Sequence, residues 1–372
     1  MKIAFLCKRR YTGKDALVDR YGRLYELPRQ LALLGHDVRV FCLDYHGSGA
    51  LQETQVEVAR GNLRWLCAAI GGWRRLMAPA YLLRLRMELG RFQPDIVVGA
   101  SDIPHVVLAA WASNRLGVPC VADLYDNFES FGQAKVPGFK WLLNKALRHS
   151  DLVVAVTRSL AAKVDDHRGA CRAAIVLPNG VDLSVFHPGD SEQARVRLGL
   201  PTGVKLVGTA GGLSRMKGLA VVYDAWQQLA VRRDDVHLVL AGPIEAGFPP
   251  PSGERVHYLG ELQNHAVADL FRSLDVGIIP IQDSDFGRYC FPQKAYEMLA
   301  TELPLVVADV GEMHALFSGF PDVLFPAGVD DGLVEAIERQ LLSRRVADIP
   351  VKDWAALAED IEPALRSLYR QV

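Results

Sequence analysis

Residues 204–230, VKLVGTAGGLSRMKGLAVVYDAWQQLA, hold a short apolar run, a glycine-rich turn and an amphipathic stretch in direct succession. A strand of about five residues that leads through glycines into a helix is the repeating unit of a parallel α/β sheet. The same succession recurs along most of the chain. The sequence therefore predicts an α/β protein made of βαβ units with right-handed crossovers, which assemble into doubly wound sheets.

The pattern occurs in two sets, and the stretch between them, residues 182–191, is rich in polar and turn residues. The expected strands of the first set are residues 3–6, 38–43, 96–99, 120–122, 152–156 and 175–177. Those of the second set are residues 204–209, 237–241, 256–259, 276–280 and 305–308. Two Rossmann-like domains are thus expected, 1–185 and 190–350, facing a central cleft, because such sheets bind ligands at the carboxyl ends of their strands. The last segment, 353–372, has helical periodicity and needs a surface to cover.

Composition excludes several classes of protein. Half of the 372 residues are hydrophobic, and no apolar run approaches the length of about 18 residues that spans a bilayer. The basic residues Lys8–Arg10 follow the first apolar run rather than precede it, which argues against an export signal. The six cysteines are scattered without metal-ligand spacing, so reduced thiols, no metal site and a cytoplasmic location are expected.

The net charge of −1 conceals a division between the two halves of the chain. Residues 1–186 hold 25 Lys and Arg against 17 Asp and Glu, whereas residues 187–372 hold 17 against 26. Either the first half meets an anionic partner, or the two domains differ in charge by chance.

The first candidate motif is residues 208–218, GTAGGLSRMKG, between an expected strand and an expected helix. Glycines let backbone N–H groups approach an anion, the helix start adds partial positive charge, and Lys217 adds a full one. These features favour a diphosphate site. The motif is neither GxxxxGK[ST] nor GxGxxG, which weighs against ATP hydrolysis and NAD binding. A tight turn with a solvated lysine is the alternative.

The second candidate motif is residues 291–307, FPQKAYEMLATELPLVV. Pro292 suits the first turn of a helix, and Lys294 and Glu297 are three residues apart on one helix face. A carboxylate in this position can accept the two hydroxyls of a ribose. An ordinary Lys–Glu surface pair is the alternative.

Five segments together resemble the family 4 retaining glycosyltransferases, which have the GT-B fold. They match in the expected order and cover nearly the whole chain: GHDV (35–38), LPNGVD (177–182), GGLSRMKG (211–218), residues 291–307 and KDW (352–354) with the last helix. The resemblance implies transfer of a sugar from a nucleoside diphosphate-sugar to a hydroxyl acceptor with retention of configuration. It also implies no metal and no cofactor, since the nucleotide-sugar is a substrate.

The resemblance assigns roles to the residues that match. Lys217 neutralises the donor diphosphate beside Gly211 and Gly212, Glu297 binds the ribose, and the main chain near Glu261 holds the base. Gly22 belongs to the segment that approaches the phosphates from the other domain. The remaining candidate donor ligand is Lys294.

The chain departs from the family pattern at three positions. Gly212 stands where the family has Arg, and Arg215 is the candidate replacement. Tyr289 stands where many members have a first glutamate, with Asp283 and Asp285 nearby. Tyr125, before Asp126, stands at the position of the family's histidine. These two are the candidate catalytic residues; the acids Asp123, Asp126 and Glu129 either bind sugar hydroxyls or line a solvated loop. His36 and His105 are expected to be structural.

Residues 60–91 hold seven arginines and one acid, Glu88, interleaved with Trp and Leu. Such a mixture suits a segment that lies on an anionic membrane, or one that holds a pyrophosphate-linked acceptor. An ordinary surface helix and loop is the alternative. Nucleic acid is disfavoured because the chain contains no familiar nucleic-acid-binding motif.

The predicted function is a glycosyltransferase that uses UDP-sugars in preference to GDP-sugars. Its expected acceptor is a saccharide or lipid-linked saccharide of envelope polysaccharide synthesis, and its expected location is cytoplasmic, with peripheral membrane contact. The rival functions are a non-catalytic nucleotide-sugar-binding subunit and a UDP-sugar 2-epimerase.

Overall fold

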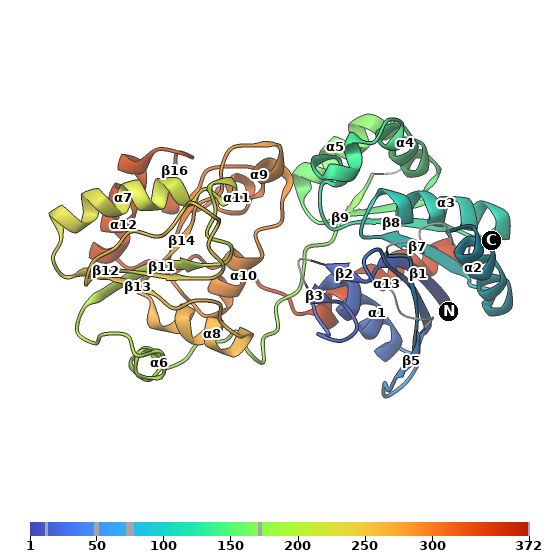
Figure 1. Ribbon diagram of the computed structural model, residues 1–372, viewed down its shortest axis with the longest axis horizontal. Coiled ribbons are helices and arrows are strands. Elements are labelled where there is room, and N and C mark those ends of the chain that lie inside the picture. The colour runs from blue at the N-terminus through green and yellow to red at the C-terminus, as the bar shows by residue number, and fades with distance from the viewer. Residues whose placement is uncertain (12–13, 48–51, 72–77, 170–172, 371–372) are drawn as a thin grey trace. The chain divides into compact units, whose positions relative to one another are not determined.

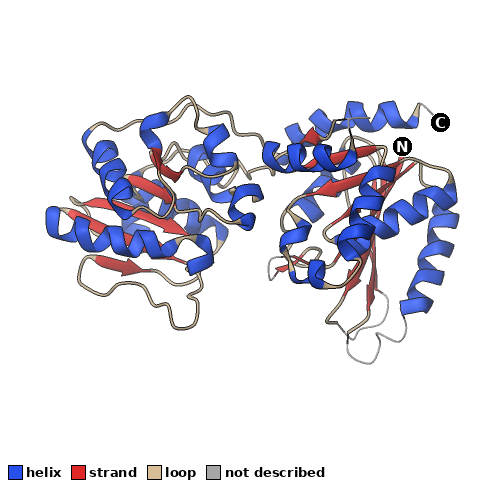
Figure 2. Ribbon diagram, turned by 90° about the horizontal axis from the view of Figure 1, so that it is seen from above, coloured by secondary structure: helices blue, strands red, loops and turns tan. Residues whose placement is uncertain are grey.

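The structure is a computed structural model that describes residues 1–11, 14–47, 52–71, 78–169 and 173–370. The chain divides into two compact units, residues 1–180 with 354–372, and residues 181–353. Each unit has its own sheet between layers of helices (Figures 1 and 2). None of the helices in the described part combines the length and apolar character that crossing a bilayer requires.

The first unit contains an eight-stranded sheet in the order β10-β9-β8-β7-β1-β4-β6-β5. Seven strands are parallel and β5 pairs antiparallel at one edge. The strands are β1 (Lys2–Lys8), β4 (Asp37–Asp44), β5 (Gln52–Val56), β6 (Asn62–Ala69), β7 (Ile96–Ala100), β8 (Cys120–Leu124), β9 (Leu152–Ala155) and β10 (Ile175–Val176). The helices are α1 (Arg23–Leu33), α2 (Ala78–Phe92), α3 (Ile103–Leu116), α4 (Phe139–His149), α5 (Arg158–Arg168) and α13 (Trp354–Tyr369), and β2 (Arg10–Tyr11) pairs with β3 (Lys14–Asp15).

The second unit contains a six-stranded parallel sheet in the order β13-β12-β11-β14-β15-β16. Its strands are β11 (Lys205–Ala210), β12 (Val236–Ala241), β13 (Val256–Tyr258), β14 (Val276–Ile279), β15 (Leu305–Ala308) and β16 (Leu324–Phe325). The helices are α6 (Ser191–Leu198), α7 (Leu219–Arg232), α8 (Asn264–Ser273), α9 (Asp285–Tyr289), α10 (Gln293–Ala300), α11 (Glu312–Leu316) and α12 (Asp330–Leu342). Helices α7 and α12 share one apolar core with the sheet, and α8 and α10 share another. The prediction of doubly wound α/β sheets is confirmed.

The expectation of reduced thiols was wrong for two cysteines, and residues 60–91 include a strand where the alternative was a surface helix and loop. The first part of this stretch is the buried strand β6, in which Trp65 is fully enclosed. The register of β6 against β4 sets Cys42 opposite Cys67, and these two residues form a disulfide. Sequence spacing could not reveal the disulfide, because only strand pairing makes the two residues neighbours. Residues 72–77, which include Trp73 and Arg74, lie outside the described residues.

A buried ion pair joins distant segments of the first unit. Arg23, the first residue of α1, is 1% exposed and donates from Nε and Nη2 to the carboxylate of Asp123 at the end of β8, at 2.7–3.0 Å. Its Nη1 donates to the carbonyl oxygens of Leu177 and Pro178, at 2.8 and 3.1 Å. All three segments must therefore be in place for the charge to be satisfied.

The last helix, α13, packs against α1 within the first unit. His36, buried in the turn after α1, contacts Glu362 of α13 at 3.0 Å. Burial lowers the pKa of His36, and the nearby N-terminal ammonium group adds to this effect while Glu362 opposes it. His36 therefore contributes to the packing of α13 on the first unit.

Replacing Arg23 with Ala is expected to lower the stability of the first unit by about 3–5 kcal/mol, because Asp123 would remain as an uncompensated buried charge. Chemical denaturation measures this loss. The matched control is Arg29→Ala on the same helix, where the partly exposed pair with Glu26 is expected to contribute less than about 1 kcal/mol. Equal losses in the two variants would contradict the structural role of Arg23.

Candidate functional site

The strand order of the second unit reverses between β11 and β14. The chain leaves β11 towards β12 through α7, and β14 pairs on the opposite side of β11. The carboxyl ends of the two strands diverge at such a point, and open α/β sheets bind their ligands there. A cavity of about 290 Å³ occupies this place. It is lined by Thr209–Leu213, Met216, Lys217, Leu219, Ile279–Gln282, Phe286 and Cys290–Lys294.

The loop after β11 forms one wall of this cavity. Ser214 accepts a hydrogen bond from the backbone N–H of Lys217 and shapes a short 3₁₀ turn, Arg215–Lys217. Gly218 follows with φ 83°, and a Cβ there would collide with the carbonyl oxygen of Pro280. The turn thus leads directly into α7, and the Lys217 ammonium lies 4.4 Å from the centre of the Phe286 ring. Lys217 is exposed and lines the cavity, as an anion ligand must.

The start of α10 forms the facing wall. Pro292 precedes the first residue of this helix, and Lys294 lines the cavity. The Lys294 ammonium donates to a carboxylate oxygen of Glu297 at 2.9 Å. Glu297 is only 7% exposed and does not itself line the cavity, so it reaches the site through Lys294.

Four of the predicted donor ligands, Gly211, Gly212, Lys217 and Lys294, therefore meet at one cavity. The other four, Gly22, Arg215, Glu261 and Glu297, do not line it. Arg215 lies with its guanidinium 4.3 Å from the centre of the Phe248 ring, and its backbone N–H donates to Glu245.

Glu261 is exposed on the loop that follows β13. Gly22 belongs to the first unit, where it precedes α1 with φ 71°. Near the substituted glutamate position, the carboxylate of Asp283 is held by Arg288 at 2.6 Å, and neither Asp283 nor Asp285 lines the cavity.

The predicted catalytic pair lies at the carboxyl edge of the first sheet. Tyr125 is buried and its hydroxyl donates to the carbonyl oxygen of Ser101 at 3.0 Å. Asp126 accepts from the backbone N–H of Asn127 at 2.8 Å. Lys8 lies 5.8 Å from the Tyr125 ring; burial lowers its pKa, and the charges of Asp102 and Asp126 act in the opposite direction.

The other two acids of this region have protein partners. Asp123 is the buried partner of Arg23, and Glu129 pairs with Lys163 at 2.7 Å. The hypothesis that Asp123 binds sugar hydroxyls or lines a solvated loop was therefore wrong, because its carboxylate is committed to an internal ion pair.

Sequence reasoning missed several residues of the cavity wall. Phe286 and Phe291 supply aromatic surface, and Gln282 and Gln293 supply amides. Phe291 and Gln293 stand inside the second motif, but their position gave no chemical signal. Phe286 was invisible because α9, which carries it, is a five-residue helix in a polar stretch.

Comparison with known proteins gives matches over both units. The model of Glycosyltransferase Family 4 matches residues 23–185, and that of Glycosyl transferases group 1 matches residues 204–343. A Bacillus subtilis (strain 168) protein named as a teichuronic acid biosynthesis glycosyltransferase, TuaC, is 26% identical over 301 residues, which cover 77% of this chain and 71% of the relative. The D-inositol 3-phosphate glycosyltransferase of Frankia alni is 26% identical over 347 residues, 82% of this chain and 81% of that relative.

The fold is similar to that of solved glycosyltransferase structures. The structure of Anabaena Alr3699/HepE in complex with UDP superposes with a TM-score of 0.73 at 17% identity, covering 99% of this chain and 100% of that one. The two family matches together span most of the chain, in the order in which the two units occur. The chain therefore belongs to the family 4, group 1 glycosyltransferases and has their GT-B fold of two Rossmann-like units.

Proposed function

We propose that this glycosyltransferase moves a sugar from a nucleoside diphosphate-sugar to a hydroxyl group of an acceptor, with UDP preferred over GDP and with retention of configuration. The observation that carries the proposal is the cavity between the loop after β11 and the start of α10, with Lys217 and Lys294 on its walls. The Lys217 cation and the backbone N–H group of Gly212 suit a diphosphate, whereas the N–H of Gly211 already donates to the carbonyl oxygen of Ala241. The complex of HepE with UDP supports the choice of nucleotide.

In the proposed reaction the bond between the anomeric carbon and the diphosphate oxygen breaks, and that oxygen keeps the electron pair. The acceptor oxygen bonds to the same face of the anomeric carbon, and its proton passes to the leaving phosphate. Lys217 stabilises the charge that develops on the diphosphate, so that no metal or cofactor is needed. Glu297, paired with Lys294, is the proposed ligand of the ribose, and the main chain near Glu261 that of the base.

In the first unit, Gly22 is proposed to approach the phosphates, and Tyr125 and Asp126 to contact the transferred sugar. The internal hydrogen bond of Tyr125 to Ser101 holds its ring in place. Because the Tyr125 hydroxyl donates its hydrogen to Ser101, the proposed role of Tyr125 is one in which this hydrogen bond is kept.

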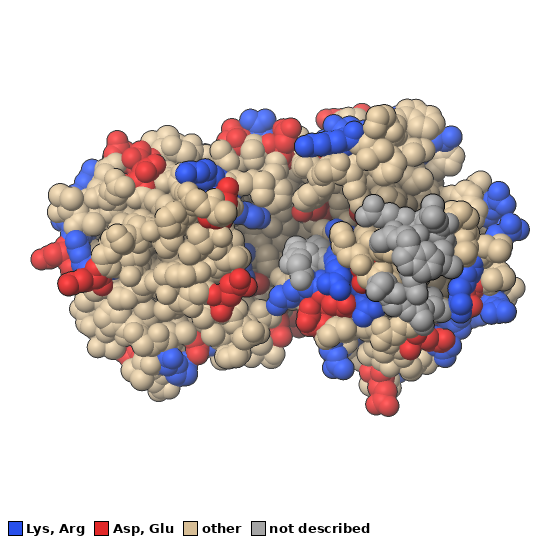
Figure 3. Space-filling view, in the orientation of Figure 1, with Lys and Arg blue, Asp and Glu red and all other residues tan. Residues whose placement is uncertain are grey.

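The proposed acceptor is a saccharide or lipid-linked saccharide of envelope polysaccharide synthesis. The relative named for teichuronic acid biosynthesis supports a polysaccharide product. We also propose peripheral contact with an anionic membrane at the cytoplasmic face. Helix α2 supports it, since Leu83 is 60% and Met87 48% exposed beside Arg84 and Arg86. Lys and Arg side chains gather at the end of the first unit where α2 lies (Figure 3).

The residues that line the cavity bear on the two rival functions, a 2-epimerase and a non-catalytic binding subunit. A 2-epimerase needs several carboxylates and a histidine around one sugar, and the described residues that line the donor cavity include neither. A non-catalytic binding subunit would keep the cavity but lack turnover.

Incubation of the protein with a panel of UDP-, GDP- and ADP-sugars without acceptor tests the proposal. Slow release of free sugar is expected, fastest from a UDP-sugar, because water replaces the absent acceptor. Chromatography of the sugars measures it. A C2 epimer among the products would favour the epimerase, and binding without turnover would favour the subunit.

Replacing Lys217 with Ala is expected to weaken UDP binding about 10–100-fold, because a charge-assisted contact to the diphosphate is lost. Glu297→Ala is expected to weaken it through the ribose and through the loss of the partner of Lys294. Isothermal titration calorimetry gives both affinities. Lys205→Ala, which removes a lysine that pairs with Asp275 in the same unit, is the control and is expected to bind UDP normally. If both site variants bind and react like wild type, the donor site is misplaced.

Flotation with vesicles tests the membrane contact. The protein is expected to float with vesicles that contain anionic lipid, and the double variant Arg84→Glu, Arg86→Glu is expected to float less, since each cation near the surface contributes about 1 kcal/mol. The double variant Arg232→Glu, Arg339→Glu changes two exposed arginines of the second unit and should float normally. Absence of flotation with any vesicle would remove the proposal.

A further inference from the structure

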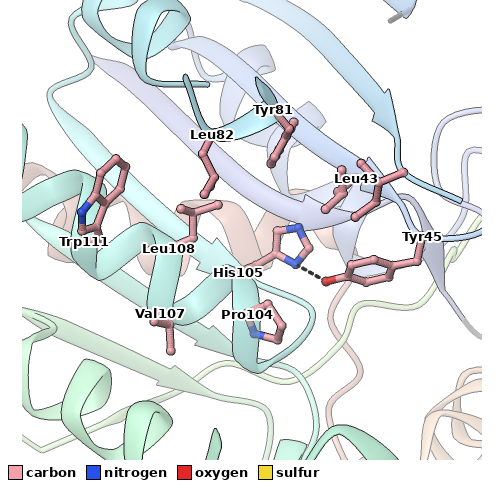
Figure 4. Close-up of a pocket in the computed structure, with 10 residues that line it drawn as sticks. Leu43, Tyr45, Tyr81, Leu82, Pro104, His105, Val107, Leu108 and Trp111 are labelled. Carbon is pink, nitrogen blue, oxygen red and sulfur yellow. Dashed lines mark hydrogen bonds between the residues drawn. The ribbon is translucent and has the colours of Figure 1, made fainter. Parts of the chain in front are cut away.

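A second cavity, of about 470 Å³, lies in the first unit where β4 and β6 end, beside the first turns of α2 and α3 (Figure 4). Its volume falls in the range of sites for small organic ligands. The side chains that line it come from four parts of the chain: Leu43, Tyr45, Ile70, Tyr81, Leu82, Pro104, His105, Val107, Leu108 and Trp111. Leu82 and Trp111 are 42% and 37% exposed, so the cavity is accessible beside them.

Asp102 forms hydrogen bonds with two side chains of this wall, His105 and Tyr45. Its carboxylate accepts from Nδ1 of His105 at 2.6 Å and from the Tyr45 hydroxyl at 2.9 Å. Burial of Asp102 would raise its pKa, but the interactions with His105 and the hydrogen bond from Tyr45 outweigh that effect and lower the pKa. Asp102 is thus an ionised acceptor at neutral pH, and Nδ1 of His105 carries the hydrogen that it accepts.

Two polar atoms of the wall remain without a partner among the described residues. They are Nε2 of His105, a side chain that is 1% exposed, and the hydroxyl oxygen of Tyr81. In Figure 4 the second nitrogen of the His105 ring points away from Tyr45, towards the side on which Tyr81 and Leu43 lie. Buried polar atoms are almost always paired, so two such atoms at one cavity call for a ligand that pairs them.

The rest of the wall restricts what that ligand can be. A saccharide has a hydroxyl on nearly every carbon, and most of these would face Leu, Ile, Val and Pro side chains without partners. A plain hydrocarbon would fill the space but leave Nε2 and the Tyr81 hydroxyl unpaired. A single hydroxyl both donates and accepts, so it can donate to Nε2 and accept from Tyr81.

We propose that this cavity binds a small apolar molecule that carries one hydroxyl group, with the hydroxyl at His105 and Tyr81 and the apolar body between Val107, Leu108 and Leu82. This binding site goes beyond the proposed sugar transfer and does not depend on it. Two kinds of apolar alcohol fit this description. One is itself the acceptor of the transferred sugar, and the other binds without reacting.

Calorimetry with the full chain and no donor tests the proposal with three probes of similar length: octan-1-ol, 1-methoxyoctane and n-octane. Octan-1-ol is expected to bind one per chain, about three- to tenfold more tightly than either other probe, because only the alcohol both donates and accepts. Equal affinity for the three probes, or no binding of any, would overturn the proposal.

Two variants locate the site. Val107→Trp fills the cavity from α3 and is expected to weaken octan-1-ol binding about tenfold or more. Asn114→Trp adds the same side chain at an exposed position of α3 outside the cavity and should leave binding unchanged. Tyr81→Phe removes one unpaired hydroxyl, so the fold should be kept while the preference for the alcohol over its ether falls about threefold. Wild-type affinity in Val107→Trp, or an unchanged preference in Tyr81→Phe, would contradict the proposed site.

A final arm adds a UDP-sugar to the octan-1-ol complex. An octyl glycoside among the products identifies the bound alcohol as an acceptor, and its absence identifies a ligand that binds without reacting. Both results keep the binding site, which the titrations alone decide. UDP binding in the second unit is measured separately, so failure of the proposed transferase and failure of this site can be told apart.

Discussion

The position of α1 in the first unit depends on one buried ion pair, that of Arg23 with Asp123. Arg23 cannot be enclosed at 1% exposure unless its guanidinium is fully paired, and its partners come from the end of β8 and from the segment that follows β10. The chain reaches this position through Gly22, whose φ of 71° an L side chain would resist. Closing this network fixes the start of α1 against the carboxyl edge of the sheet. It also removes Asp123 from any chemistry with a substrate, although its neighbours Tyr125 and Asp126 stand at the same edge.

The regular part of the fold was readable from sequence because buried parallel strands are almost continuous apolar runs. Pro292 was expected at the first turn of a helix, and α10 begins at the next residue, Gln293. Strand β6 was not predicted, because Arg64 and the surrounding arginines are typical of a basic surface segment. In the structure Arg64 pairs with Gln55 and Glu53 of the edge strand β5, which covers that side of β6. Only the sheet order explains why an arginine can stand beside the buried Trp65, and the disulfide of Cys42 and Cys67 depends on the same register.

The residues of the candidate site were predictable where they belong to a backbone motif. The interaction partners of individual side chains were not. Gly211, Gly212, Lys217 and Lys294 occupy the two segments that end at the reversal of strand order, so their meeting at one cavity follows from topology. Arg215 and Asp123 are different cases. Arg215 contacts Phe248, 33 positions further along the chain, and Asp123 pairs with Arg23, 100 positions earlier. Neither partner can be identified from spacing, since tertiary packing alone brings them within reach.

The glycines in and beside the loop after β11 bear on which cation is proposed for the diphosphate. Gly218 and Gly242 are required by packing, because a Cβ would collide with the carbonyl oxygens of Pro280 and Gly211. A Cβ at Gly212 would meet nothing within 4 Å, so the fold does not demand glycine at the position where related enzymes have Arg. Arg215, the candidate replacement for such an Arg, lies on Phe248 and does not line the cavity. Lys294 lines the cavity but already neutralises Glu297. Among the described lining residues, Lys217 is therefore the cation that we propose for the diphosphate.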